Sequence, residues 1–344
     1  MSKKPIAIVS TDKHLKEDNA LELLDLAEQE IALAKEMGVS IVIWLGDIFD
    51  SRLSQRQEIL ICLTEMIEMY YQAGIQIKCI PGNHDKTDYT ADESFLTPYK
   101  FHPGFKLIEI PEIQVVNGVH FSFIPFYTQD VWLEKFGTLD PPSSKKSVLF
   151  SHIAVQGSIN NDGTKVESKI KLSLFKNYGK VFLGHYHNAH QPGVNVFHLP
   201  ATRQNNFGED EEKGFTVLYD NLSFDLVKAS FKPYKTIEVN AAKVTKDELL
   251  SLSKTDSTEA NIRVVITGDQ QAVKSINKKW FTDNGITVKA KYEDVEVENV
   301  EEATLIQEIS GNDLKQKFQT FCEEKGYDYS TGYKLLKEIM QWQE

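Results

Sequence analysis

Cysteine is scarce in this sequence. Its three cysteines, Cys62, Cys79 and Cys322, stand far apart among 344 residues. Cysteines so widely spaced, in helix-like or strand-like surroundings, form neither a disulfide framework nor a zinc-binding pattern. A scaffold of disulfides is therefore excluded, and a reducing compartment, the cytoplasm, is the predicted location.

Long apolar runs are also absent. No stretch approaches the roughly 18 apolar residues that a membrane-spanning helix needs. The apolar part of the N-terminal MSKKPIAIVSTDKHL is too short for a secretory signal. We therefore expect no membrane partner. With 41% hydrophobic and 26% charged residues, the composition is that of an ordinary globular protein, and the length predicts two or three domains.

Positive charge is in deficit. The formal net charge is −12, the wrong sign for a protein that grips nucleic acid with its whole surface. Any contact with phosphates would have to be local, assisted by metal ions or shared with a partner. One exception is the segment 163–180, which carries Lys165, Lys169, Lys171, Lys176 and Lys180 against the single acid Glu167. Charge alone leaves open a solvated lysine face or a phosphate-binding strip.

The first half of the chain alternates between strand and helix patterns. Strands are predicted in PIAIVST, SIVIWLG and IQIKCIPG, with helices over 19–37 and 54–73. This βαβαβ order predicts a parallel sheet whose sites form at the carboxyl ends of its strands. The middle of the chain turns toward β structure, with seven short strand patterns running from KLIEI to GFTVLYD, followed by FDLVKASFKPY.

A second α/β unit is predicted after Pro233. Its elements are the strand KTIEVNA, a helix over 244–253, the strand NIRVVITG, a helix over 270–284 and the strand TVKAKYEDVEV. The remaining residues follow helical spacing. We therefore expect three parts, residues 1–232, 233–302 and a helical tail over 303–344.

Histidines cluster after one of the apolar runs. In VFLGHYHNAH, His185 and His187 stand two apart at a predicted strand end, a spacing that points both imidazoles the same way. Four other strand patterns end in similar chemistry: Asp12-Lys13-His14, Gly46-Asp47-Ile48-Phe49-Asp50, Gly82-Asn83-His84-Asp85 and Ser151-His152. We expect all five strands to deliver these groups to the same edge of one sheet.

The mixture of carboxylate, amide and imidazole groups indicates metal ions. It suits Mn²⁺, Fe²⁺ or Zn²⁺ better than Ca²⁺, whose sites are built from oxygen. Seven candidate ligands are too many for one ion and match two ions that share a carboxylate. Two ions about 3.5–4 Å apart can clamp the attacking and leaving oxygens of a phosphoester.

In this order, D-x-H, G-D-I-F-D, G-N-H-D, S-H and G-H-Y-H resemble the motifs of the calcineurin-like metallophosphoesterases. The segment LPATRQNNFGEDEEKGFTVLYD, with GDIFDSR and IPGNHD, is similar to the SbcD-type DNA repair nucleases. This group includes the meiotic-recombination nuclease and a recombination nuclease subunit of tailed phages. The likeness covers residues 5 to about 232. It implies an α/β metallophosphoesterase sandwich of mixed sheets flanked by helices, with a small α/β capping domain and a helical tail.

The resemblance also implies roles for individual residues. Two divalent ions, Mn²⁺ before Mg²⁺, Fe²⁺ or Zn²⁺, would take the following ligands: Asp12, His14 and His187 for one ion, Asn83, His152 and His185 for the other, and Asp47 as a bridge. His84 would be the catalytic histidine, placed to protonate or steady the leaving 3′ oxygen. Asp50 would orient His84.

Other residues are candidates for contacts with substrate and partners. Arg203, one of four arginines, is a candidate phosphate ligand or the partner of a surface salt bridge, and Lys165 and Lys169 are candidate substrate-binding residues. The apolar stretch 59–70 is either buried against the sheet or forms the contact of a homodimer. By resemblance, the tail would dock onto an SbcC-like ABC-type ATPase.

The predicted function is that of a two-metal-dependent DNA nuclease subunit. By resemblance it would act as exonuclease and endonuclease on DNA ends, hairpins or single strands, together with the ATPase, in recombination and double-strand-break processing. The location would be a bacterial or phage-infected cytoplasm. Two alternatives remain: a metallophosphoesterase for a small nucleotide or a phosphoprotein, and a mainly architectural subunit that binds DNA ends.

Overall fold

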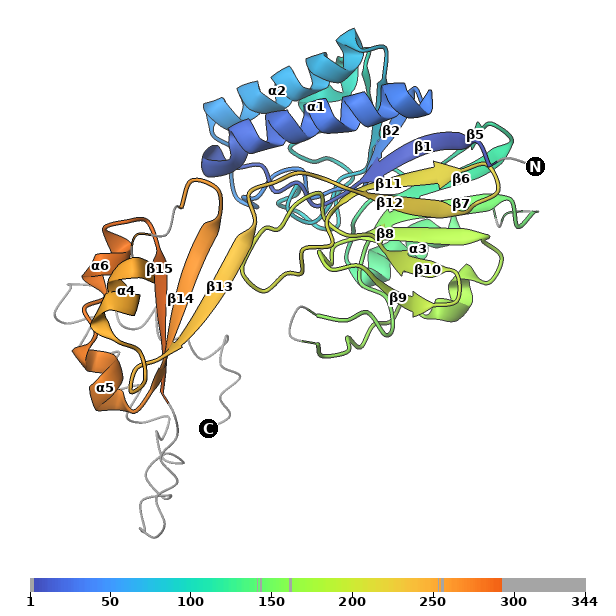
Figure 1. The fold of residues 1–344 in the computed structure, drawn as a ribbon. Helices are drawn as coiled ribbons and strands as arrows, with labels where there is room; N and C mark the ends of the chain where they lie inside the picture. Colours follow the sequence, from blue (N-terminus) through green and yellow to red (C-terminus); the bar gives the residue numbers. More distant parts are fainter. Residues whose placement is uncertain are drawn as a thin grey trace, which may run out of the picture.

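The computed structural model describes residues 3–292 apart from residues 141, 143, 161, 162, 253, 255 and 256. The predicted tail over 303–344 and the last ten residues of the predicted part 233–302 lie outside the described residues. Two six-stranded sheets form a sandwich over residues 3–228, and a three-stranded sheet forms a C-terminal unit over residues 234–292 (Figure 1). The predicted boundary at Pro233 falls between them and stays a prediction.

The first sheet of the sandwich has the order β12-β11-β1-β2-β3-β4. Its strands are β1 (Pro5–Ser10), β2 (Ile41–Trp44), β3 (Gln76–Cys79), β4 (Phe105–Leu107), β11 (Gly214–Tyr219) and β12 (Phe224–Lys228). Strands β1 to β4 are parallel, as the βαβαβ pattern predicts, and β11 and β12 add an antiparallel hairpin at one side.

The second sheet has the order β5-β6-β7-β8-β10-β9. Its strands are β5 (Glu112–Val116), β6 (Val119–Ile124), β7 (Ser147–His152), β8 (Lys180–Gly184), β9 (His190–Gly193) and β10 (Val196–His198). Strands β6, β7, β8 and β10 are parallel, and β5 and β9 pair antiparallel at the two edges. The predicted strand KLIEI joins the first sheet as β4, and the edge strand β9 was not predicted.

Helices cover the outer faces of both sheets, so the sandwich has four layers. The helices α1 (Ala20–Met37) and α2 (Gln57–Gln72) lie on the first sheet, and α3 (Gln129–Gly137) packs with the second sheet (Figure 1). Among the described residues, no helix has the length and apolarity needed to span a membrane.

The period of two along the strands explains the layers. Ile8, Trp44 and Ile77 pack against the helices, whereas Val9 and Ile43 point to the other face and pack against the second sheet. The inner layer is rich in aromatic rings from the second sheet, namely Phe121, Phe123, Phe150 and Phe182. Both faces of the first sheet are thus buried, which is typical of parallel strands covered by helices.

The C-terminal unit is a parallel sheet of β13 (Tyr234–Asn240), β14 (Asn261–Gly268) and β15 (Thr287–Tyr292), with α4 (Lys246–Leu252), α5 (Gln270–Ser275) and α6 (Lys279–Thr282). The prediction of one helix over 270–284 is wrong. Ile276 takes an extended backbone (φ −78°, ψ 126°) and is buried in the core of this unit. The Asn277 side chain then accepts a hydrogen bond from the Lys279 amide at 3.1 Å and starts the next helix.

The five strand ends that carry the candidate ligands do not belong to one sheet, so that prediction is wrong. Strands β1, β2 and β3 lie in the first sheet, and β7 and β8 lie in the second. The stacked sheets bring these ends together: the Leu45 carbonyl after β2 accepts a hydrogen bond from the His152 ring at the end of β7. Two stacked sheets therefore build one site.

Candidate metal centre

The turns that follow the strands hold four candidate ligands in the left-handed region of backbone conformation. The φ angles are 53° at Asp12, 48° at His14, 51° at Asp47 and 87° at His185. These are four of the six non-glycine residues with positive φ in the described part of the chain. Such conformations cost energy and persist where the surrounding structure imposes them. The fold therefore keeps strained backbone at these turns, which directs the four side chains toward one another.

The Asp47 carboxylate lies at the middle of the cluster. Its Oδ1 accepts a hydrogen bond from the His84 amide at 2.8 Å. Its Oδ2 lies 3.3 Å from His152 Nε2 and 3.7 Å from His14 Nε2. One carboxylate oxygen thus faces imidazoles from both predicted ligand sets, which is the position that a bridging ligand would need.

The first ligand set, here the Asp12 group, consists of Asp12, His14 and His187. His14 Nε2 and His187 Nε2 are 3.0 Å apart, and His187 Nε2 is 3.7 Å from Asp12 Oδ1. Two nitrogens bound at a right angle to one ion at ~2.1 Å would be ~3.0 Å apart. The Thr11 hydroxyl donates to Asp12 Oδ2 at 2.7 Å and keeps that carboxylate in place.

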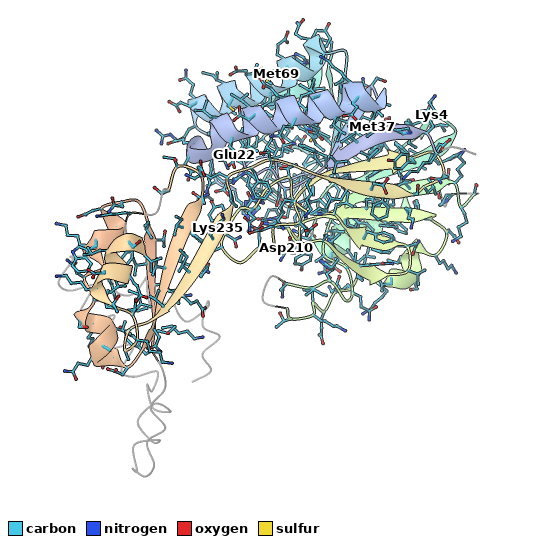
Figure 2. All side chains as sticks on the ribbon, in the orientation of Figure 1. Lys4, Glu22, Met37, Met69, Asp210 and Lys235 are labelled. Carbon is cyan, nitrogen blue, oxygen red and sulfur yellow. The ribbon has the colours of Figure 1, made fainter. Side chains whose placement is uncertain are left out.

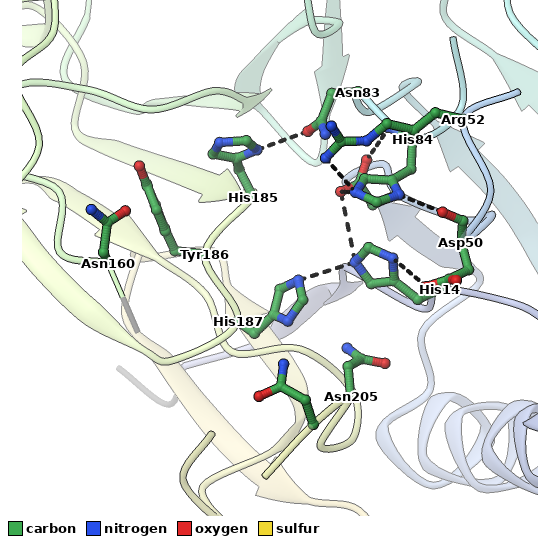
Figure 3. A pocket seen from close by; sticks show the side chains of 12 residues that line it. His14, Asp50, Arg52, Asn83, His84, Asn160, His185, Tyr186, His187 and Asn205 are labelled. Carbon is green, nitrogen blue, oxygen red and sulfur yellow. Dashed lines mark hydrogen bonds and ion pairs between the residues drawn. The ribbon is translucent and has the colours of Figure 1, made fainter. Parts of the chain in front are cut away.

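The second ligand set, here the Asn83 group, consists of Asn83, His152 and His185. Asn83 Oδ1 lies 2.8 Å from His185 Nδ1 (Figure 3). It also lies 3.1 Å from His152 Nε2. The structure therefore brings all seven predicted ligands together in two groups on either side of Asp47. Their role as ligands stays a prediction.

The far nitrogens of two of these imidazoles have hydrogen-bond partners of their own, and that of a third lies within ion-pair distance of a carboxylate. His152 Nδ1 donates to the Leu45 carbonyl at 2.6 Å, and His187 Nδ1 donates to Glu209 Oε1 at 2.6 Å. His14 Nδ1 lies 3.5 Å from Asp50 Oδ1. A partner on one ring nitrogen selects the tautomer that leaves the other nitrogen free to bind a metal.

The electrostatics of the site are dominated by burial and by Asp47. Burial lowers the pKa of His152, but the charge and hydrogen bond of Asp47 outweigh it and raise that pKa to about 9. Burial and the neighbouring His152 lower the pKa of His185 to about 3. Burial raises the pKa of Asp47, yet the surrounding histidines, His152 first, hold it well below its ordinary value. A bound cation would replace the proton that Asp47 stabilises on His152.

The donor set fits divalent cations. Asp12, His14, Asp47, Asn83 and His152 are all less than 5% exposed. Carboxylates and imidazoles packed this closely away from water are costly without a compensating charge. Two carboxylates, one amide oxygen and four imidazoles provide the mixed oxygen and nitrogen donors that Mn²⁺, Fe²⁺ or Zn²⁺ accept.

His84 lies beside the two groups and differs from them in its contacts. Its Nδ1 contacts the backbone carbonyl of Asp50 at 2.5 Å, and its Nε2 faces Arg52 Nη2 at 2.7 Å. His84 thus contacts the Asp50 backbone, whereas the Asp50 carboxylate lies beside His14. That Asp50 orients His84 stays a prediction. Burial, ahead of the opposing charge of Asp47, lowers the pKa of His84.

Asp85 braces this part of the site from behind. Its Oδ1 accepts from the amides of Ile48 and Phe49 at 2.9 and 3.0 Å, and its Oδ2 accepts from the Gly82 amide at 2.8 Å. It thereby ties the turn after β3 to the turn after β2. Burial and the nearby Asp47 raise the pKa of Asp85 to about 6.

Arg203 does not line the cavity, and its predicted role as a phosphate ligand is wrong. Its side chain is 2% exposed, its Nη1 donates to the Gln204 carbonyl at 2.9 Å, and it lies 3.4 Å from Glu22 of α1. The alternative prediction was a surface salt bridge. Arg203 does lie near the carboxylate of Glu22, but the Arg203 side chain is buried. The sequence around a single arginine in a polar segment does not indicate whether its side chain is buried or exposed.

Lys165 and Lys169 line a different cavity of about 920 Å³, with Gln129, Gln156, Gly157, Val166, Glu167, Ser168 and Lys171. Lys169 is paired with Asp130 at 2.7 Å. Asn160 connects the lysine-rich segment 163–180 to the metal centre. It lines the metal-centre cavity, and its backbone amide donates a hydrogen bond to the Thr164 carbonyl. Substrate binding by these lysines stays a prediction.

The cavity at the metal centre has a volume of about 370 Å³ (Figure 3). Besides predicted site residues it is lined by Arg52, Asn160, Tyr186, Asn205 and Asn206. The sequence reasoning missed Arg52, Asn205, Asn206 and also Glu209, although GDIFDSR and RQNNFGEDEEKG contain them. The available signal was an arginine two residues after Asp50 and a polar run within 25 residues of His187.

A family model fits this arrangement. The model for the calcineurin-like phosphoesterases matches residues 7–189, more than half of the chain, from β1 to the turn that carries His187. The chain belongs to the calcineurin-like phosphoesterases. The predicted resemblance and the predicted sandwich are thereby confirmed. Membership supports a metal-dependent hydrolase of phosphoester bonds. Three overlapping sets of side chains among the described residues lie close enough together to hold a metal ion: Asp12, His14 and His187; His14, Asp47 and His84; and Asp47, His152 and His185.

Two known proteins are similar to this phosphoesterase over part of their length. It is 25% identical over 198 residues to exonuclease subunit 1 of Enterobacteria phage T4. The aligned region is 56% of each chain, so the phosphoesterase matches just over half of that relative's length. A nuclease MPE of Pseudomonas putida is 14% identical, with 57% of this chain and 74% of that chain covered at a TM-score of 0.29, a distant likeness.

Proposed function

We propose that this phosphoesterase is a two-metal-dependent DNA nuclease subunit. The observation that carries the proposal is the position of Asp47 Oδ2, 3.7 Å from an imidazole of the Asp12 group and 3.3 Å from one of the Asn83 group. Such a shared carboxylate suits a pair of ions acting on one phosphodiester. DNA as the substrate is supported by the relative in phage T4, which is named an exonuclease subunit.

In this proposal the residues of the site have separate roles. The Asp12 group and the Asn83 group would each hold one ion, with Asp47 between them, and the bound ions would polarise the phosphodiester as Lewis acids. His84 would hold or move a proton at its Nε2, the ring nitrogen that faces the cavity side of Asp47 at 4.0 Å. The Arg52 guanidinium, beside that nitrogen, would bind a phosphate oxygen of the strand.

The partners belong to the proposal as well. We expect a homodimer and an SbcC-like ATPase partner bound through residues 303–344, which lie outside the described part of the chain. Helix α2 offers one supporting feature: Ile61 is 56% and Tyr71 is 44% exposed on a helix whose remaining apolar residues are buried or partly buried. All seven candidate ligands and His84 lie in the sandwich, so the test begins with this chain alone.

The test compares the wild type with His84→Gln. Each protein is assayed with Mn²⁺ on end-labelled double-stranded DNA and on bis-p-nitrophenyl phosphate, and Mn²⁺ binding is measured in parallel. We expect the wild type to cleave DNA and His84→Gln to lose cleavage while it still binds Mn²⁺, because His84 is outside both ligand groups. Glu93→Gln, a substitution outside the site, serves as the control and should keep wild-type activity.

Two other outcomes would change the assignment. Turnover of the small ester without DNA cleavage, even with an ATPase partner added, would favour a phosphoesterase for small substrates. DNA binding with no turnover of either substrate, despite bound Mn²⁺, would favour an architectural subunit.

A further inference from the structure

The loop over residues 204–213 lies between the metal centre and the C-terminal unit. It follows β10 and leads into β11, outside the region that carries the five motifs. Glu209 of this loop contacts the ring of a predicted ligand: its Oε1 accepts from His187 Nδ1 at 2.6 Å. The Glu209 side chain is 0% exposed. A fully buried carboxylate on the far nitrogen of a metal-binding imidazole is a known way to hold its ring in place.

Glu209 is itself held from several directions. Its Oε2 accepts from the Asn205 amide at 3.0 Å, and its Oε1 accepts from Asn206 Nδ2 at 2.7 Å. The buried ammonium of Lys213 lies 3.9 Å from Oε2 and donates to the His187 carbonyl at 2.9 Å. The carboxylate and the backbone of His187 are therefore fastened to the same loop.

The opposite side of the loop contacts the C-terminal unit. Gln204 bridges the two: its Nε2 donates to the Glu209 carbonyl and its Oε1 accepts from the Tyr234 amide, both at 2.8 Å. Phe207 packs edge-on against the Tyr234 ring at 4.8 Å, and the Arg263 guanidinium lies 4.6 Å from the centre of the Phe207 ring. Figure 2 shows side chains gathered in this region, near the labels Asp210 and Lys235.

We infer that Glu209 is a positioning residue for His187, and that the C-terminal unit keeps Glu209 in place through Gln204 and Phe207. The path is continuous: Tyr234 and Arg263 on the C-terminal unit, Gln204 and Phe207 on the loop, then Glu209 and His187. The affinity of the Asp12 group for its ion would therefore depend on how the C-terminal unit is seated. The Asn83 group has no contact with this loop among the described residues and would not respond.

This inference rests on the proposed metal-binding role of His187 but not on DNA as the substrate. The test is a titration with Mn²⁺ alone, followed by the electron paramagnetic resonance signal of the free ion, which counts sites and resolves two affinities. For Glu209→Gln we expect the dissociation constant of one site to rise by a factor of roughly 10 to 100, with the other site unchanged. A general loss of structure would instead weaken both sites.

Phe207→Ala provides a second variant that leaves Glu209 and all ligands intact. We expect it to weaken the same single site by a smaller factor. Because both substitutions act on one path, the double variant should be no weaker than Glu209→Gln alone. The matched control is Glu212→Gln, which removes an exposed acid of the same loop that pairs with Lys228, and it should bind Mn²⁺ like the wild type.

The outcomes separate the inference from the proposed function. If the wild type binds no Mn²⁺, the proposed function fails. If the wild type binds two ions and Glu209→Gln binds them unchanged, the positioning role of Glu209 is overturned. If Glu209→Gln weakens one site but Phe207→Ala does not, the link to the C-terminal unit is overturned. Urea unfolding in EDTA identifies any variant that has lost its fold.

Discussion

Asp50 makes two separate contacts in the site, one through its carboxylate and one through its backbone carbonyl. Its side chain lies 3.5 Å from His14 Nδ1, while its backbone carbonyl holds the His84 ring. The His14 imidazole, 3.5 Å away, outweighs the opposing effect of burial and lowers the pKa of Asp50, so the carboxylate is charged at neutral pH. At the scale of single residues, Asp50 therefore belongs with the Asp12 group.

We expect Asp50→Asn to weaken Mn²⁺ binding at one site by roughly tenfold, because it removes the negative charge beside His14. The His84 contact should survive, since the substitution keeps the backbone carbonyl. The measurement is the Mn²⁺ titration described for Glu209. Asp18→Asn, an exposed acid near Lys16, is the control. Unchanged affinity together with lost turnover would mean that Asp50 acts on the substrate instead.

Lys86 predicts a pH dependence of stability. Its ammonium is buried, donates to the Ala91 carbonyl at 2.7 Å and lies 4.1 Å from the centre of the Tyr127 ring. Burial lowers its pKa from 10.5 to about 8. Between these two pH values the unfolded chain holds the proton and the folded chain does not, so the free energy of unfolding gains up to about 1.4 kcal/mol per pH unit from this group.

Lys86→Met removes this proton-linked contribution. We expect the free energy of unfolding, measured by urea titration from pH 7 to pH 10, to rise less steeply with pH in the variant than in the wild type. Taking the difference between the two proteins cancels the tyrosines and cysteines that titrate in the same range. Parallel curves would show that Lys86 keeps an ordinary pKa in the fold.

The sequence motifs identified the candidate ligands but not the residues that hydrogen-bond to those ligands. Asp12, Asp47 and His187 were predictable because glycine, carboxylate and imidazole spacings at strand ends are read directly from sequence. Glu209 could not be predicted, since nothing in a run of acids tells which one turns inward to a histidine 22 residues away. Arg203 failed for the same reason: sequence gives its charge but not its burial.

At the scale of elements, the two sheets meet at glycines where the strands end. A methyl group added at Gly184, the last residue of β8, would lie 2.7 Å from His152 Nδ1 and 2.8 Å from the Leu45 carbonyl oxygen. Real side chains do not approach backbone this closely. Glycine is thus required here by the distance between the sheets and not by an unusual backbone angle.

We expect Gly184→Ala to destabilise the sandwich by at least about 1–3 kcal/mol, the usual cost of overpacking a core. Gly137→Ala, at the end of α3, is the control: a methyl group there meets no atom within 4 Å, and alanine favours the helix. It should be neutral or more stable by about 0.5–1 kcal/mol. Urea unfolding measures both. Equal stabilities would show that the strand ends can move apart.

The elements themselves were largely predictable, and their partners were not. The helices over 19–37 and 54–73 are observed as Ala20–Met37 and Gln57–Gln72, because apolar spacing and the glycines after them are local signals. A period of two says which face of a strand is buried but not which sheet the strand joins, so the pairing of β4 with β3 in the first sheet could not be predicted. The helix over 270–284 failed because burial of Ile276 in extended backbone overrides helical spacing.

At the scale of the whole molecule, the sandwich and the C-terminal unit have separate cores. Three apolar clusters fill the layers of the sandwich, and a fourth, with Val264, Ile266 and Phe281, lies within the C-terminal unit. The candidate ligands all lie in the sandwich and come from both of its sheets. A bound ion would therefore join the two sheets at their carboxyl ends, where strained turns and buried carboxylates otherwise oppose folding.

This arrangement predicts the effect of removing metal. A ligand that binds only the folded state stabilises it by about 2.7 kcal/mol when its free concentration is 100 times the dissociation constant. In differential scanning calorimetry, we expect Mn²⁺ in place of EDTA to raise the midpoint of the larger transition, that of the sandwich. The smaller transition of the C-terminal unit should move much less, because all seven candidate ligands lie in the sandwich. Equal shifts of both transitions, or a single merged transition in EDTA, would show instead that the two cores unfold together.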